Sequence, residues 1–182
     1  MYTGKLVKLR AYKKEDLALA QEYVNSAEIR QYMENNIPFL YTIDNEEKWY
    51  ESISPQNELY NFAIEVLETG EYIGGCGING LDYKNSVASV GIFIGNPDYL
   101  SRGYGTDALK ILVKFIFEEM NINKVRLHVY DFNARAQKCY EKVGFKKEAV
   151  LKEELFRHGK YHDVIQMSIF KRDYFKENPV QD

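Results

Sequence analysis

The spacing of hydrophobic and polar residues changes several times along the chain, and each change predicts a new element. Lys5 to Arg10 roughly alternates, which predicts a first strand. Lys14 to Val24 carries its apolar residues on one helical stripe and predicts a helix. Asp44 with Glu47 three residues later resembles a capping box, so we expect a short helix that ends at Pro55. The first third of the chain has the least regular pattern.

The middle of the chain predicts three strands in succession. Residues 62–66 and 72–78 are apolar runs separated by the polar segment Glu68–Glu71, which is typical of two strands joined by a tight turn. A third strand covers residues 88–94, and Pro97 stops it because proline cannot donate a hydrogen bond to a sheet. We therefore expect an antiparallel meander here.

The second half of the chain begins with the strongest helical pattern. From Gly105 onward the apolar residues recur at intervals of three and four, the period of an α-helix. Asn133 can cap a later helix, and Gly144 can end it. The remaining predicted elements are strands over 125–130, 148–156 and 161–170, with a turn at His158 and Gly159. Together they predict an α+β (mixed α/β) fold around a mostly antiparallel sheet.

Length and composition restrict the class of protein further. A chain of 182 residues suits one compact domain, which we place at 1–176 with a short tail at 177–182. With 45% hydrophobic and 28% charged residues the chain is not a disordered or fibrous protein. The net charge of −3 argues against a broad basic nucleic-acid surface and is compatible with a cationic substrate. No apolar run approaches the roughly 18 residues of a membrane span, so we expect a cytoplasmic protein.

The segment from Ile92 to Thr106 carries the first chemical signal. A strand stops near Pro97, Gly103 and Gly105 follow with one residue between them, and the best helix starts there. Unpaired amides at such a helix start bind anions, and Arg102 adds a positive charge. Taken alone, the glycine pair is a weak signal that also suits a simple tight turn. The sequence has neither a Gly-Lys-Ser/Thr phosphate loop nor a three-glycine dinucleotide motif.

A second cluster, Asn133 to Phe145, strengthens the first. It reads Asn-x-x-Ala-x-x-x-Tyr-x-x-x-Gly-Phe without a gap, and Leu100 to Gly105 fits the loop pattern Gln/Arg-x-x-Gly-x-Gly/Ala. With both motifs at this separation, the chain resembles the GNAT superfamily of acyl-CoA-dependent N-acetyltransferases over about residues 5 to 175. One departure is Leu100, which stands where the family usually has Gln or Arg. Binding through backbone amides tolerates that change.

The resemblance implies a fold, a cofactor and a set of site residues. It implies about seven strands, with a splay between those at 88–94 and 125–130 into which the cofactor enters. The donor is acetyl-CoA and no metal is needed. Residues 102–106 would cradle the pyrophosphate, and Tyr140 would be the general acid at the thioester sulfur. The implied cofactor-binding residues are Ile92, Phe93, Ile94, Leu100, Ser101, Arg102, Gly103, Tyr104, Gly105, Thr106, Asn133, Ala136 and Tyr140.

The acceptor amine must be neutral to attack the thioester. Neutralising an alkylamine of pKa about 10.4 at pH 7 costs about 4.6 kcal/mol, whereas an α-amine of pKa about 7.8 costs about 1 kcal/mol. An alkylamine therefore needs a base or a water chain, for which Glu65 and Glu34 are candidates. Cys139 lies about 100° around the helix from Tyr140, which disfavours a covalent acetyl-cysteine step.

The three histidines do not predict a metal site. His158 and His162 flank the predicted turn and are expected to be solvated, since no ligand cluster accompanies them beyond Asp163. His128 lies on a predicted strand, and we expect it to be hydrogen-bonded or exposed. Neither cysteine has metal-ligand spacing.

The expected function is therefore acetyl transfer from acetyl-CoA to a primary amine. The run from Glu154 to Met167 resembles the branch that contains spermidine N-acetyltransferases and ribosomal-protein N-terminal acetyltransferases. The acceptor is accordingly a polyamine or other small amine, or a protein N-terminal α-amine, and its pocket should form between Asn25 and Leu59. The alternative is a non-catalytic acyl-CoA-binding or sensing module. A homodimer or higher homo-oligomer is also left open.

Overall fold

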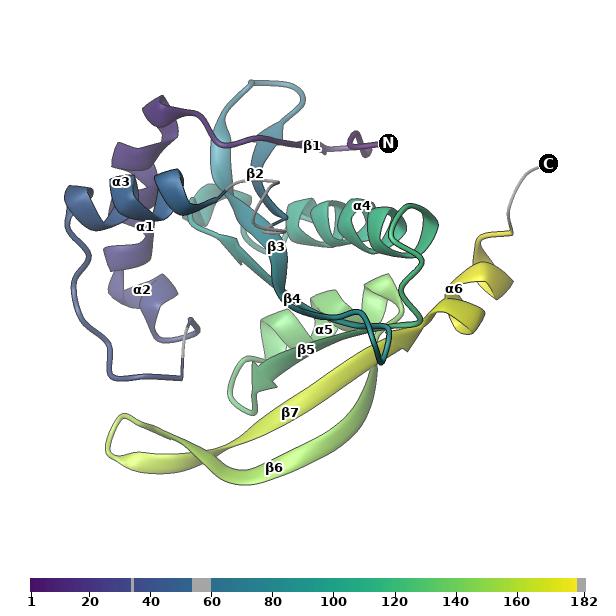
Figure 1. Ribbon diagram of the computed structural model, residues 1–182. Coiled ribbons are helices and arrows are strands. Elements are labelled where there is room, and N and C mark those ends of the chain that lie inside the picture. Colours follow the sequence, from purple (N-terminus) through teal and green to yellow (C-terminus); the bar gives the residue numbers. More distant parts are fainter. Residues whose placement is uncertain (34, 54–59, 180–182) are drawn as a thin grey trace.

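The computed structural model describes residues 1–33, 35–53 and 60–179, and in them one sheet organises the chain (Figure 1). Seven strands lie in the order β1-β2-β3-β4-β5-β7-β6, and every neighbouring pair is antiparallel except the parallel pair β4–β5. The predicted mostly antiparallel sheet is confirmed. The strands are β1 Val7–Arg10, β2 Asn61–Val66, β3 Tyr72–Asp82, β4 Val87–Ile94, β5 Lys124–Tyr130, β6 Lys146–Arg157 and β7 Lys160–Phe170.

Each helix that the periodicity predicts is present, and the structure adds short helices at Ala27–Arg30 and Lys171–Glu177, for which no helix was predicted. The helix that was predicted from Gly105 begins one residue earlier, and Asn133 and Gly144 cap the later helix as expected. The helical segments that bear on the site are η1 Lys14–Asp16, α1 Leu17–Asn25, α2 Ala27–Arg30, α3 Ile43–Ser52, η3 Pro97–Tyr99, α4 Tyr104–Glu118, α5 Ala134–Val143 and α6 Lys171–Glu177. Since α6 runs to Glu177, the predicted domain end at 176 falls within its last turn.

The start of α3 corrects one prediction. Its N-cap is Thr42, whose side chain accepts a hydrogen bond from the Asn45 backbone at 3.3 Å, while the Asn45 side chain accepts one from the Thr42 backbone at 2.9 Å. The capping box is therefore two residues upstream of the Asp44 and Glu47 pair. Thr42 and Asn45 make the reciprocal hydrogen bonds that were expected of Asp44 and Glu47. The helix was therefore predicted correctly, but its N-cap residue was not. Pro55, the predicted helix stop, lies outside the described residues.

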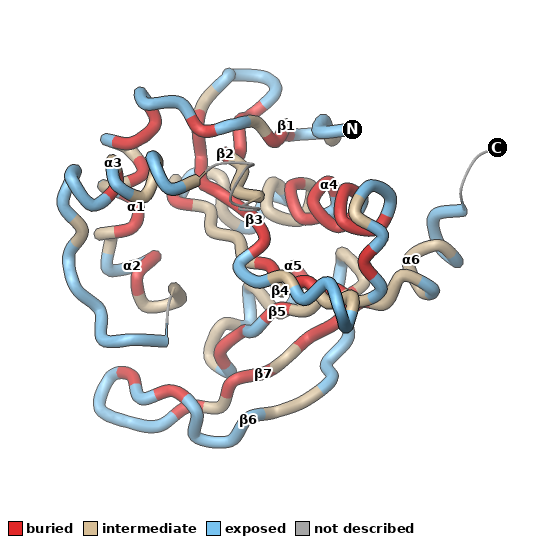
Figure 2. Tube along the Cα trace, in the orientation of Figure 1, coloured by how far each residue is buried: buried red, intermediate tan, exposed pale blue. Residues whose placement is uncertain are grey.

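Two clusters of apolar side chains cover the two faces of the sheet. On one face α4 packs its buried stripe, including Leu109, Leu112 and Ile116, against the strands, and α5 lies beside it. On the other face α1 and α3 pack around Tyr12, Tyr23 and neighbouring aromatic rings. Figure 2 shows this as buried segments along α4 and the central strands, with exposed segments at the end of the β6–β7 hairpin. The β4–β5 junction therefore lies between the α4–α5 layer on one face and the α1–α3 layer on the other.

The parallel strands β4 and β5 stay together over only part of their length. Their ladder consists of Val87 with Lys124, Ala88 with Val125, and Ser89 with Arg126. Beyond Ser89 the strand β4 continues to Ile94 and remains paired with β3, while β5 continues to Tyr130 paired with β7. Within the described part of the chain, one edge of each strand is therefore left without a strand partner, and the predicted splay is confirmed.

Candidate active site

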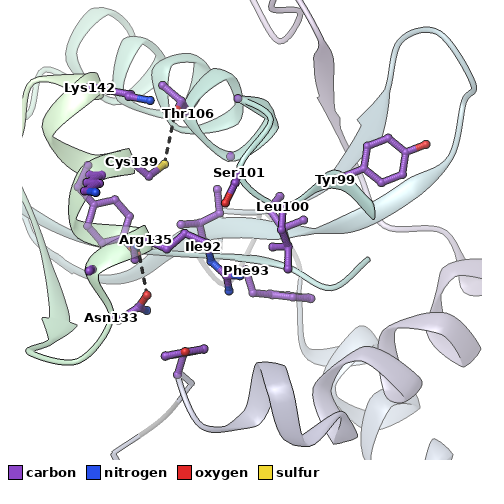
Figure 3. Close-up of a pocket in the computed structure, with 18 of the residues that line it drawn as sticks. Ile92, Phe93, Tyr99, Leu100, Ser101, Thr106, Asn133, Arg135, Cys139 and Lys142 are labelled. Atoms are coloured by element: carbon purple, nitrogen blue, oxygen red, sulfur yellow. Dashed lines mark hydrogen bonds between the residues drawn. The ribbon is translucent and has the colours of Figure 1, made fainter. Parts of the chain in front are cut away.

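A cavity of about 480 Å³ lies where β4 leaves β5, between the start of α4 and α5 (Figure 3). Every predicted cofactor-binding residue lines it except Arg102 and Tyr104. The strand edge Ile92–Ile94 forms one wall, and residues of α5, including Asn133 at its cap and Tyr140, form the opposite wall. The two sequence motifs, some thirty residues apart in the chain, thus meet across one slot.

The corner before α4 is shaped by two left-handed residues. Ser101 has φ 60° and Gly103 has φ 96°, and Gly103 is the N-cap of α4. Glycine at this φ avoids the penalty that other residues incur, so Gly103 has a conformational reason to be there. The first amides of a helix have no intrahelical acceptor, and the helix dipole gives this end partial positive charge. The corner can accordingly bind an anion that enters the cavity.

Neighbouring contacts hold this corner in place. Glu71 accepts hydrogen bonds from the Tyr99 hydroxyl at 2.7 Å and from the Asn96 side chain at 2.8 Å. The Asp107 carboxylate, in the first turn of α4, accepts from the Leu6 and Val7 amides at 2.7 and 3.1 Å. The loop and the helix are therefore fixed before any ligand binds, which lowers the ordering cost of binding.

The structure places the Arg102 side chain away from the cavity. Its Nη1 donates to the Asp98 carbonyl oxygen at 3.0 Å, and both Arg102 and Tyr104 line a separate polar depression. Tyr104 packs edge-to-face on Tyr99 with ring centroids 4.8 Å apart. The placement of the Arg102 side chain therefore gives no support to its expected role as the positive charge in this cavity.

Positive charge reaches the cavity from α5 instead. Arg135, Lys138 and Lys142 all line it. Sequence reasoning missed them, although their spacing of three and four residues places them on one helical face. Cationic side chains beside a helix start favour a phosphorylated ligand.

Asn133 and Cys139 each make a defined contact. The Asn133 side-chain oxygen accepts from the Ala136 amide at 3.2 Å and so caps α5, which leaves its amide NH₂ as the group that can reach a ligand. The Cys139 thiol lies 3.3 Å from the Thr106 hydroxyl, and burial raises its pKa. A thiol with a raised pKa is a poor nucleophile, in agreement with the prediction that Cys139 forms no acetyl intermediate.

A second cavity, of about 520 Å³, lies on the other side of the slot. Its wall is rich in aromatic rings and includes Glu154 and His128. Leu151 and Glu154 reach it from an irregular stretch of β6, where the register with β7 shifts between Leu151 and Leu155. The residues that line both cavities are Tyr32, Met33, Ile92, Phe93 and Tyr140. The two cavities therefore meet at a shared wall that contains Tyr140.

Burial controls the chemistry of Tyr140. The side chain is 8% exposed, and burial raises the pKa of its phenol well above the usual range, with the neighbouring Cys139 acting in the same direction. The phenol is therefore protonated at neutral pH. A protonated phenol at the junction of two cavities can give its proton to a leaving group there.

The acidic residues suggested as bases fare differently. Glu65 is buried beneath Lys8, at 2.7 Å, and Arg10. Burial alone would raise the pKa of Glu65, but the bonds and charges of Lys8 and Arg10 outweigh it and lower the pKa. Because Glu65 lines neither cavity, its placement gives no support to its role as the base. Glu34 lies outside the described residues.

The histidines correct one more expectation. His162 is not solvated: it is buried on β7, where its Nδ1 lies 3.2 Å from an Asp131 carboxylate oxygen and its ring packs against Phe132. His158 is exposed at the turn, as predicted, and His128 is exposed with a contact to Gln166.

No group of three potential metal ligands occurs within residues 1–33, 35–53 and 60–179. No helix in these same ranges is long and apolar enough to cross a membrane.

A sheet that opens between two parallel strands, with a helix start and cationic side chains at the opening, suits a protein that binds a phosphorylated ligand there. The chain belongs to the acetyltransferase (GNAT) domain family, whose model matches residues 7–146. The protein is an acetyl-CoA-dependent N-acetyltransferase, and acetyl-CoA is its acyl donor. The alternative of a non-catalytic acyl-CoA module is thereby superseded.

Relatives cover nearly the whole chain. The spermidine N(1)-acetyltransferase of Escherichia coli K12 is 30% identical over 172 residues, which are 94% of this chain and 90% of that protein. The uncharacterized N-acetyltransferase p20 of Bacillus licheniformis is 29% identical over 176 residues, 96% of this chain and 97% of that one. A crystal structure of the Vibrio cholerae spermidine N-acetyltransferase with CoA and spermine superposes with a TM-score of 0.83 at 28% identity, covering 93% of this chain and 98% of that one.

Proposed function

We propose that this protein acetylates a polyamine, with the cofactor and the acceptor entering the slot from opposite sides. The cofactor occupies the cavity of about 480 Å³, its pyrophosphate at the start of α4 and its pantetheine arm along Ile92–Ile94. The acceptor occupies the cavity of about 520 Å³. Tyr140 stands where the two ligands meet.

The cytoplasm, where acetyl-CoA is available, is the proposed location of the protein. The single domain and the homo-oligomer stay predictions.

The aromatic wall of the second cavity carries this proposal. Tyr12, Tyr32, Trp49 and Tyr130 present rings to the cavity, and Glu154 adds a carboxylate at an exposed position on it. Aromatic faces attract ammonium groups, and they also contact the aliphatic segments between them. A polyamine alternates these two features along its length. Full-length similarity to spermidine acetyltransferases favours the same class of acceptor.

The proposed chemistry is direct transfer. The neutral acceptor amine attacks the thioester carbonyl, a C–N bond forms, and the tetrahedral intermediate collapses with cleavage of the C–S bond. The Tyr140 phenol gives its proton to the departing CoA sulfur, while the nitrogen loses one proton. The products are an N-acetylated amine and free CoA. Holding both substrates at one wall supplies the proximity that such a bimolecular step needs.

Release of free CoA thiol across a panel of acceptors tests this function. Spermidine and spermine should give the highest kcat/KM, ahead of monoamines, aminoglycosides and peptides with a free N-terminus. Glu154→Gln should raise the KM for spermidine roughly two- to fivefold, the size expected for one exposed charge pair, and leave the KM for acetyl-CoA unchanged. A preference for peptide N-termini over polyamines would overturn the polyamine assignment in favour of a protein α-amine.

A further inference from the structure

His128 lies where the slot opens. The β4–β5 ladder ends at the pair Ser89 and Arg126, and His128 follows Arg126 by two residues, as Gly91 follows Ser89. Side chains two residues apart on a strand share a face, so His128 and Gly91 lie on the same face as Arg126 and Ser89, one position beyond the first separated pair, Val90 and Leu127. The Asn79 side chain occupies the space beside Gly91, where a Cβ atom would meet it. His128, Gly91 and Tyr140 all line the acceptor cavity.

A chain of hydrogen bonds fixes which imidazole nitrogen is basic. The Gln166 amide Nε2 donates to Glu148 at 2.9 Å, and Glu148 also accepts from Lys124 and Ser168. Gln166 therefore turns its side-chain oxygen to His128, whose Nε2 lies 3.3 Å away. An amide oxygen only accepts, so the hydrogen of a neutral His128 sits on Nε2. The lone pair is left on Nδ1.

The anchor of this chain keeps its charge. Hydrogen bonds from Lys124 and Ser168 outweigh the opposing effect of burial and lower the pKa of Glu148 to about 2. Glu148 is thus a permanent acceptor over the pH range in which an enzyme works. Gln166 has no reason to reverse its amide, and the orientation of His128 persists.

We propose that His128 is the catalytic base of the transfer, with Nδ1 accepting the proton that the acceptor nitrogen loses as the C–N bond forms. This inference rests on the proposed function. The amine lone pair forms the new bond, the thioester C–S bond breaks, and the sulfur takes the Tyr140 proton. Exchange with water then returns a proton from the His128 imidazolium to the Tyr140 phenolate, so both residues end as they began.

The surroundings of His128 support this role. Two ionisable residues, Arg126 and Tyr130, lie on the same strand as His128. The Arg126 Nε donates to the Ser89 hydroxyl at 3.0 Å. The other ionisable groups near His128 are Glu148, through Gln166, and Glu154 on β6, and Tyr140 on α5. Among the described residues that line this cavity, His128 supplies an imidazole and Glu154 a carboxylate, the side-chain types that most often act as general bases. Imidazole is the side chain that enzymes use most often as a general base.

The pH dependence of kcat/KM, measured with the full chain and the best acceptor of the panel, tests the proposal. The wild type should lose activity toward acidic pH, because a protonated imidazole cannot accept the proton. His128→Gln should lower kcat roughly 100-fold and abolish that acidic limb, while the Kd for CoA changes less than twofold. The matched control His158→Gln, at the exposed turn, should keep the wild-type profile.

Two further variants separate a base from a structural residue. Added imidazole should restore part of the activity of His128→Ala, since a free base can enter the space that the side chain leaves. Gln166→Leu should reduce kcat and leave the KM for acetyl-CoA unchanged. An unchanged pH profile in His128→Gln, or loss of the acidic limb in Glu154→Gln instead, would overturn the proposal. A wild type that prefers peptides would overturn only the polyamine assignment, because His128 is tested with whichever amine is acetylated.

Discussion

At the residue scale, Tyr140 illustrates how burial sets chemical role. The same phenol on the surface would exchange protons with water, but between the two cavities it is held protonated and shielded. In the proposed mechanism the phenol faces the departing CoA sulfur. The ordinary pKa of a thiol lies below that of a phenol, so Tyr140 is the weaker acid, and its contribution depends on lying beside the sulfur as negative charge develops there. The fold therefore contributes the position of the Tyr140 hydroxyl more than a lowered pKa of its phenol.

Tyr140→Phe should lower kcat by roughly 10²-fold to 10⁴-fold, because the ring still packs but no proton donor remains. The Kd for CoA, measured by calorimetry, should change less than twofold. Tyr161→Phe is the matched control, since Tyr161 is 63% exposed at the β6–β7 turn, and its kcat should equal that of the wild type. A Tyr140→Phe enzyme with full turnover would remove the phenol from the mechanism.

Some site residues could be predicted from the sequence and others could not, for reasons visible in the side chains. Gly103 was predictable because its role is conformational and local. The direction of Arg102 was not, since it depends on the left-handed turn at Ser101 and on a carbonyl acceptor at Asp98. Lys138 and Lys142 were predictable from helical spacing once α5 had been assigned. His128 was noticed in the sequence, but its neighbour Gln166 comes from a strand far along the chain.

At the element scale, the proposed binding of the cofactor pyrophosphate depends on the N-terminus of α4. A Cβ atom added at Gly105 would lie 3.6 Å from Ile94 and 3.8 Å from the Cys139 sulfur, ordinary contact distances. The residue therefore has room for a methyl group in the absence of ligand. Because Gly105 lines the cavity, that methyl group would occupy space that the phosphate needs in the proposed binding mode.

Gly105→Ala should weaken CoA binding about tenfold, the loss of roughly one charge-assisted hydrogen bond, without weakening the fold. Alanine favours the helix by up to about 1 kcal/mol over glycine, so the Tm should stay level or rise. Gly80→Ala is the control: its Cβ would meet Ser89 at 3.8 Å, and Gly80 lines neither cavity. Unchanged CoA affinity in Gly105→Ala would show that the phosphates lie elsewhere.

Helices and strands were predictable because their periods are local. The apolar stripe of α4 and the alternation of β5 each follow from a short stretch of sequence, and the structure confirms both. The cap of α3 was misplaced because Thr42 with Asn45 and Asp44 with Glu47 both satisfy the capping pattern. The hairpin β6–β7 was longer than expected, since its outer part has few buried residues to create a period.

At the scale of the whole molecule, the slot comes from the connections between distant strands. β5 leaves β4 after Ser89 and Arg126, while β7 holds β5 from Lys124 to Tyr130. The Tyr130 hydroxyl donates to the Met33 carbonyl at 2.6 Å and so joins β5 to the segment after α2, part of the shared wall. None of these pairings has a local pattern. The splay was predictable only through the family resemblance.

Hydrogen exchange of the backbone amides, with and without CoA, tests most directly the claim that the slot beside β4 and α4 holds the cofactor. CoA should slow exchange at residues 92–94 and 103–106 at least tenfold and leave the turn at residues 158–159 unchanged. Protection confined to another part of the chain, with no change at residues 92–94 and 103–106, would contradict the proposed site.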